Sequence, residues 1–118
     1  MLTKEQLLKT LAIFKHTGKK GHSLLDYAKE YLLEDPLLLE HDPLLVVKNG
    51  RIYGSCKCSY NKTSGKICEH IIAKIIYLYR ELLEDEPDWQ EFIEKYKEVL
   101  KKAVDKIEAR VPEDFANF

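Results

Sequence analysis

Residues 56–70 read CKCSYNKTSGKICEH, and they hold all three cysteines of the chain together with one of its four histidines. Two cysteines form a C-x-C pair, nine residues follow, and a C-x-H pair ends the stretch. Three thiolates and one imidazole are a donor set that suits tetrahedral zinc. The pattern therefore predicts one zinc ion per chain, with four ligands: Cys56, Cys58, Cys68 and His70.

A zinc ion with four protein ligands has no open position for an activated water, so the pattern favours a structural site over a catalytic one. The rest of the sequence offers no obvious nucleophile and base pair and no glycine-rich phosphate loop. We therefore expect no enzymatic activity and no small-molecule substrate.

Two alternatives to zinc remain open. The cysteines could be ordinary buried side chains beside a surface histidine, although free cysteines favour apolar surroundings and these stand among Lys, Ser, Asn and Gly. A [2Fe–2S] centre of the CDGSH type also uses three cysteines and one histidine. In that pattern the histidine is further from the last cysteine and the loop carries a proline, whereas here only Glu69 separates Cys68 from His70 and 59–67 contain no proline.

The segments around the cluster predict a hairpin followed by a helix. Residues 44–58 place β-branched and aromatic residues on both sides of Asn49-Gly50, a pair that suits a type I′ turn. Apolar residues at helical spacing then predict a helix from about Cys68 to 83. The cysteine pairs would thus lie at the end of the second strand and in the first turn of this helix. Residues 44–83 are the predicted zinc-binding module.

Helices are predicted on both sides of this module. The capping pairs Thr3–Gln6 and Ser23–Asp26 begin helices over about 4–16 and 24–35, which form a helical extension over 1–35. Residues 35–43 contain two Asp-Pro steps and predict an irregular connector. Asp88 is expected to cap a last helix over 88–110, whose apolar stripe runs from Trp89 to Ile107. The fold class is therefore α+β, with a single domain over 1–118.

Composition places the chain among folded proteins. It has 118 residues, of which 45% are hydrophobic and 33% charged, with a formal net charge of −1. No apolar run reaches the roughly 20 residues that cross a bilayer, and the start lacks the apolar block of a signal peptide. We expect a cytoplasmic protein without membrane contact, where cysteines are rarely paired in disulfides.

The C-x-C and C-x-H pattern, in its strand–strand–helix context, resembles the SWIM zinc-finger family. The resemblance covers 44–83, about a third of the chain. Ala73, three residues after His70, also matches the Shu-complex type of SWIM protein, which partners recombinase paralogues in homologous recombination. The resemblance implies zinc as cofactor, a structural role for Ala73, and a recombinase-paralogue-like ATPase as protein partner.

A second functional hypothesis comes from the charge distribution. Residues 43–68 carry five cations and no Asp or Glu. A phosphate-contacting surface is predicted from five residues of this segment, namely Arg51, Lys57, Tyr60, Lys62 and Lys66. The same lysines could instead balance an anionic zinc site. The near-zero net charge favours an adaptor that binds a protein, with weak DNA binding and association with the nucleoid as the alternative. His16, His22 and His41 are expected to be exposed to solvent without a role.

Overall fold

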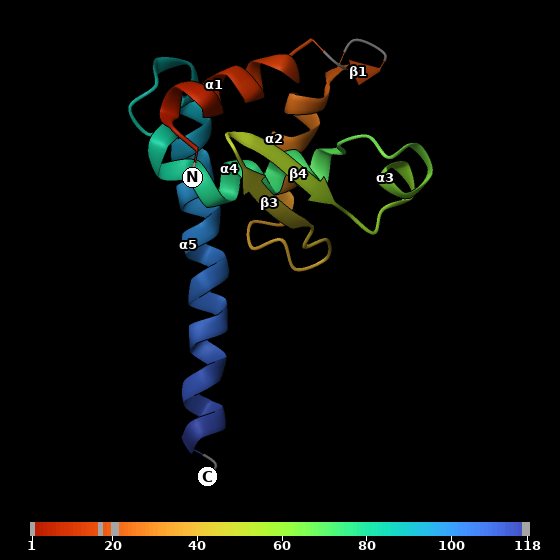
Figure 1. The fold of residues 1–118 in the computed structure, drawn as a ribbon. Helices are drawn as coiled ribbons and strands as arrows, with labels where there is room; N and C mark the ends of the chain where they lie inside the picture. The colour runs from red at the N-terminus through yellow and green to blue at the C-terminus, as the bar shows by residue number, and fades with distance from the viewer. Residues whose placement is uncertain (1, 17, 20–21, 117–118) are drawn as a thin grey trace.

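The computed structural model describes residues 2–16, 18–19 and 22–116 of the chain. Across these ranges the chain folds as a small α+β domain with five helices and two antiparallel strand pairs (Figure 1). The predicted fold class is confirmed. One pair, β1 (Gly18–Lys19) with β2 (His22–Ser23), is only two residues long per strand and was not predicted. The other is the predicted hairpin.

Both N-terminal helices begin where the capping pairs place them. In α1 (Lys4–Ile13) the Gln6 backbone N–H donates to the Thr3 hydroxyl at 3.2 Å, and the Thr3 N–H donates to the Gln6 side chain at 3.0 Å. In α2 (Leu24–Glu34) the Asp26 N–H donates to the Ser23 hydroxyl at 3.1 Å. These bonds satisfy backbone donors that have no partner within the helix.

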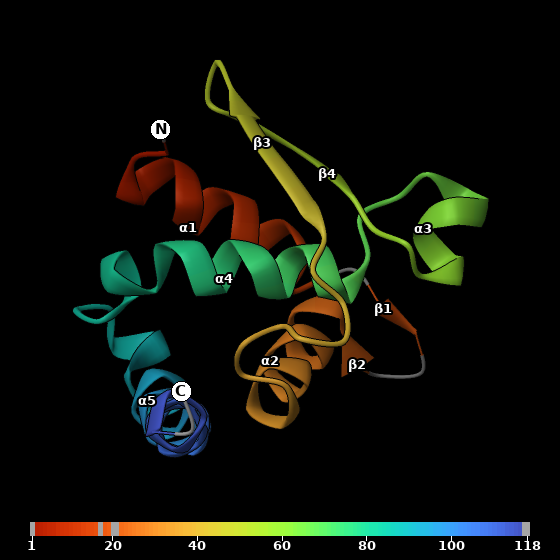
Figure 2. The ribbon, with the colours of Figure 1, turned by 90° about the horizontal axis from the view of Figure 1, so that it is seen from below.

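Helix α4 (Glu69–Leu83) lies at the centre of the domain, with α1, α2, α5 and the hairpin against its sides (Figure 2). Its buried residues occupy a broad face, as the periodicity predicted: His70, Ile71, Ile72, Ala73, Ile75, Ile76 and Leu83. Because three helices and the hairpin pack on this helix, the two ligands at its start are attached to the most buried part of the protein.

The predicted hairpin is formed by β3 (Leu44–Lys48) and β4 (Arg51–Ser55). Its turn has positive φ at both Asn49 and Gly50, 54° and 74°, as a type I′ turn requires. Alternate residues point to opposite faces of a strand. The inner face packs against the core through Leu45, Val47 and Ile52, while the outer face is exposed.

The last helix, α5 (Pro87–Ala116), is longer than predicted at both ends. It begins at Pro87, a residue well suited to a first helical position because its missing N–H would be unpaired there. Asp88 therefore lies in the first turn and is not the cap. The helix also continues past the expected end at Arg110.

The predicted apolar stripe of α5 belongs to the core only in its first part. Four of its side chains are buried, namely Trp89, Phe92, Ile93 and Tyr96, whereas Ile107 is 45% exposed. Figure 1 shows the rest of α5 extending away from the body of the domain. None of the helices in the described ranges is both long enough and apolar enough to cross a membrane.

Candidate metal centre

The four predicted ligands come together at one point. The three sulfur atoms and one ring nitrogen of His70 all lie within 4.8 Å of one another. Zinc–sulfur bonds of about 2.3 Å in a tetrahedron place two sulfurs roughly 3.8 Å apart, so a single ion could reach all four donors with small adjustments. The described side chains therefore form a group that could hold a metal ion.

Each pair of ligands lies where a strand or helix begins or ends. Cys56 directly follows β4, and Cys58 is the residue before α3 (Ser59–Ser64), a short helix that the sequence pattern does not indicate. Cys68 is the residue before α4, and His70 lies in its first turn. The centre thus connects the end of the hairpin to the start of the central helix.

Asn61 closes the loop between the two pairs. Its side-chain oxygen accepts from the Cys56 backbone N–H at 3.0 Å, and its side-chain nitrogen donates to the Lys66 carbonyl at 2.8 Å. One side chain on α3 therefore links both ends of the loop. Sequence reasoning missed this role, although an asparagine midway between two ligand pairs is a residue type that commonly bonds to nearby backbone.

Burial governs the ionisation of the centre. It raises the pKa of Cys56, and it raises the pKa of Cys68 to about 12. Burial also lowers the pKa of the His70 imidazole, and the neighbouring His41 acts in the same direction. Cys58 differs: burial acts to raise its pKa, but hydrogen bonds from backbone N–H groups and from the other thiols lower it overall. Metal binding would replace the protons of the buried thiols, which is the usual chemistry of such sites.

The His70 ring is held between two aromatic rings. His41 stacks on it with 4.1 Å between ring centroids, and Tyr31 meets it edge-on at 4.7 Å. The ring nitrogen Nδ1 then lies 3.7 Å from Cys56 Sγ. His70 therefore presents Nδ1 to the cysteines.

The expectation that the His41 side chain is exposed to solvent is wrong. Its side chain is only 30% exposed because the connector before β3 folds back over α4. Asp35 fixes this connector: its carboxylate accepts from the N–H groups of Leu39 and Glu40 at 2.9 and 3.0 Å and from the Tyr31 hydroxyl at 2.7 Å. His16 is exposed as expected, and the side chain of His22 lies outside the part of the chain that is described.

We expect His41→Ala to weaken zinc binding about tenfold, because the His70 ring loses the neighbour that fixes its orientation, an effect of the size seen for residues that support metal ligands. His41→Phe should restore most of the affinity, since it keeps a stacked ring. The measurement is competition with a chromophoric chelator, together with the absorption spectrum of the cobalt-substituted protein. His16→Ala is the control. If His41→Ala binds zinc as tightly as the original protein, His41 does not fix the orientation of the His70 ring.

The residues predicted to contact phosphates lie at two places along the hairpin and α3. Lys57, Lys62 and Lys66 are on or beside α3, but Arg51 lies beside Lys48 at the turn of the hairpin. Four strand intervals of about 3.4 Å separate the turn from the other end of the hairpin, roughly 14 Å. Tyr60 is half-buried and packs against the core.

Ala73 is fully buried on α4, one turn after His70. Its methyl group packs within the hydrophobic core and is not a metal ligand.

Comparison with known proteins gives no match: no family model matches the chain, and no curated protein or solved structure is similar at a significant level.

Proposed function

We propose that this chain is a non-enzymatic zinc-binding adaptor of SWIM type. The observation that carries the proposal is the convergence of the four donor atoms of Cys56, Cys58, Cys68 and His70 within 4.8 Å of one another. Four protein donors around one ion leave no position for a reacting water, so the metal would have a structural role.

The donor geometry supports a single ion over an iron–sulfur cluster. A two-iron cluster holds its ligands as two pairs on opposite sides of the cluster, whereas here all four donor atoms are mutual neighbours. Cysteine thiolates with one histidine are also among the usual ligand sets of structural zinc. Zinc is therefore the proposed metal.

Metal analysis of protein purified without added metal tests this step. We expect one zinc per chain and no inorganic sulfide. A brown preparation that contains iron and sulfide would contradict the zinc assignment, and protein without any metal that is stably folded would contradict the proposal as a whole.

For the partner, we propose a recombinase-paralogue-like ATPase, which places the adaptor in DNA recombination and repair. The support is the C-x-C, C-x-H and Ala73 pattern together with a net charge of −1, which does not favour a protein that binds DNA by charge alone. Co-purification of the tagged chain from its native host should recover such an ATPase in stoichiometric amount. Recovery of nucleic acid without a protein would reverse the order of the two hypotheses.

Direct nucleic-acid binding is the second candidate, and one observation favours it. Lys57, Lys62 and Lys66 form no ion pair with any residue that the structure describes. Three phosphate contacts would give a slope of about −2 to −3 in log K against log salt. Replacing all three lysines by glutamate should then abolish DNA binding without releasing zinc. If the adaptor hypothesis is right, a variant in which only Lys62 and Lys66 are replaced by glutamate still binds the ATPase.

A further inference from the structure

The outer face of the hairpin exposes three large apolar side chains: Leu44, Val46 and Tyr53, which are 74%, 57% and 55% exposed. Val46 and Tyr53 are directly paired across the two strands, and Leu44 lies on the same face two residues before Val46. Alternation along the strands explains the arrangement, since the opposite face is the one that packs on the core. We call these three residues the outer hairpin face.

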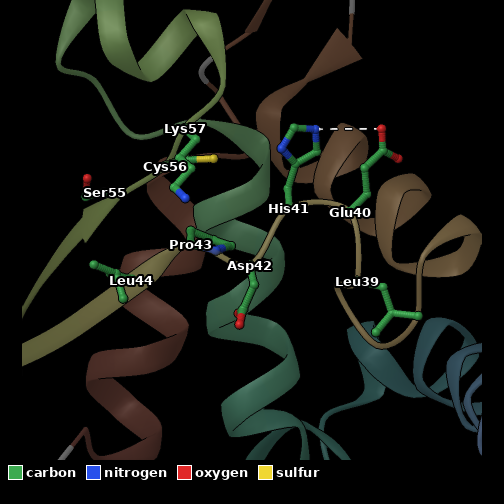
Figure 3. A pocket seen from close by; sticks show the side chains of 9 residues that line it. All are labelled: Leu39, Glu40, His41, Asp42, Pro43, Leu44, Ser55, Cys56 and Lys57. Atoms are coloured by element: carbon green, nitrogen blue, oxygen red, sulfur yellow. Dashed lines mark ion pairs between the residues drawn. The ribbon is translucent and has the colours of Figure 1, made fainter.

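A pocket of about 310 Å³ continues this face at the end near the metal centre (Figure 3). Leu44 and Ser55 line it from the hairpin, and Leu39, 77% exposed, lines it from the connector. Of the acidic residues at this pocket, Asp42 pairs with Lys74, whereas Glu40 is 77% exposed and points its carboxylate toward the His41 ring nitrogen at 4.0 Å. An apolar side chain could therefore enter the pocket beside Leu39 and Leu44.

Cations lie at both ends of the outer hairpin face. Lys48 and Arg51 are paired across the strands at the turn, and Lys57 lines the pocket at the other end. None of the three forms an ion pair within the described ranges, and no Asp or Glu occurs between residues 43 and 68. Lys57 is six residues after Arg51, so a binding partner with acidic groups roughly 14 to 20 Å apart, the length of four to six strand intervals, would match both ends.

The outer edges of the two strands also present backbone N–H and C=O groups to a binding partner. In the described part of the chain, β3 and β4 pair only with each other, so each has an outer edge without a neighbouring strand. Such an edge can accept an extended segment as a further strand, with specificity supplied by alternate side chains.

We propose that the outer hairpin face is the docking surface for an extended protein segment with large apolar residues at alternate positions and acidic residues about four to six positions apart. The proposal rests on the proposed adaptor function, because it names the surface through which the adaptor binds its partner. A second copy of this chain fits the face poorly, since the hairpin itself carries no Asp or Glu that could pair with Lys48 and Arg51 of another copy. Nucleic acid also fits less well, because two of the three side chains of the face, Leu44 and Val46, are aliphatic and only Tyr53 could stack on a base.

The test is a selection of random dodecapeptides, displayed on phage, on the zinc-loaded full chain. We expect enriched sequences with alternating large apolar residues and with Asp or Glu at the stated spacing. A synthetic peptide of the consensus should bind at least about tenfold more weakly to Val46→Ser/Tyr53→Ser, a loss that corresponds to about 1.4 kcal/mol. Leu78→Ser is the matched control, because Leu78 is 51% exposed on α4 and lies outside this face.

Charge reversal gives a second measurement on the same surface. Lys48→Glu/Arg51→Glu should bind the acidic consensus peptide more weakly and should select peptides with basic residues in place of acidic ones at one end. Peptides that bind the Val46→Ser/Tyr53→Ser variant as tightly as the original protein would overturn the proposal, as would the absence of any enrichment.

Two other outcomes would also overturn it. Loss of binding to a thymidine 20-mer in the Val46→Ser/Tyr53→Ser variant would assign the face to nucleic acid, and self-association lost in that variant would assign it to a second copy. The zinc content of each preparation distinguishes a failure of the docking surface from a failure of the proposed function. Failure of peptide binding at one zinc per chain contradicts only the docking surface, whereas protein without zinc contradicts the proposed function.

Discussion

Removal of zinc by a strong chelator should lower the melting temperature by more than about 10 °C, which corresponds to several kcal/mol of unfolding free energy in a domain of this size. The hairpin is a two-stranded unit that is marginal by itself, and the side chains by which β3 and β4 pack on the core are only half-buried. The metal would provide the missing attachment between β4 and α4. Circular dichroism and differential scanning calorimetry, with and without chelator, measure the effect.

Substitution of one ligand should have a similar effect. Cys68→Ser removes a buried thiolate donor at the start of α4, and the protein should lose both its zinc and several kcal/mol of stability. His16→Ala is the control, because His16 is exposed and distant in sequence from the ligands. An unchanged melting temperature in the presence of chelator would show that the site is not structural.

Local sequence signals predicted the elements that depend on local interactions. The capping pairs correctly predicted where α1 and α2 begin, and Asn49-Gly50 correctly predicted the position of the hairpin turn. In the same way, the four cysteine and histidine positions were found because their spacing is short and their chemistry is distinctive. Each of these signals lies within about fifteen residues, so no knowledge of tertiary packing was needed.

Helix α3 was missed because it has no apolar periodicity. Its six residues are all polar except Tyr60, and none of them is buried. Side-chain bonds to nearby carbonyls accompany it instead: the Thr63 hydroxyl donates to Ser59 at 2.7 Å, and the Ser64 hydroxyl donates to Tyr60 at 2.6 Å. Such bonds are equally typical of turns, so the sequence could not distinguish a short helix from a loop.

The contact between His41 and His70 could not be predicted for a different reason. The two residues are far apart in the sequence, and the connector that carries His41 has no periodicity. Its path depends on tertiary contacts, among them the bond from the Tyr96 hydroxyl on α5 to the Pro36 carbonyl at 2.7 Å. A contact that depends on several packed elements is visible only in the folded chain.

Gly54→Ala should destabilise the protein by about 1 to 3 kcal/mol, the usual cost of overpacking. Gly54 belongs to the inner face of β4, where a Cβ atom would lie only 2.6 Å from Cγ2 of Ile71 on α4. The strand must therefore move away from the helix. Because Cys56 follows two residues later, the same shift should weaken zinc binding, which chelator competition would detect.

A double-mutant cycle identifies Ile71 as the cause. Ile71→Ala alone should cost about 2 to 5 kcal/mol, because it leaves a cavity in the core. In that background the methyl group added by Gly54→Ala occupies part of the space that the isoleucine vacated. The glycine substitution should then become neutral or stabilising, with a coupling free energy of at least about 1 kcal/mol. Ser55→Ala, on the exposed face of the same strand, is the control and should change little. If the effects of the two substitutions on the free energy of unfolding are simply additive, the close approach of β4 to α4 is not the reason why position 54 requires glycine.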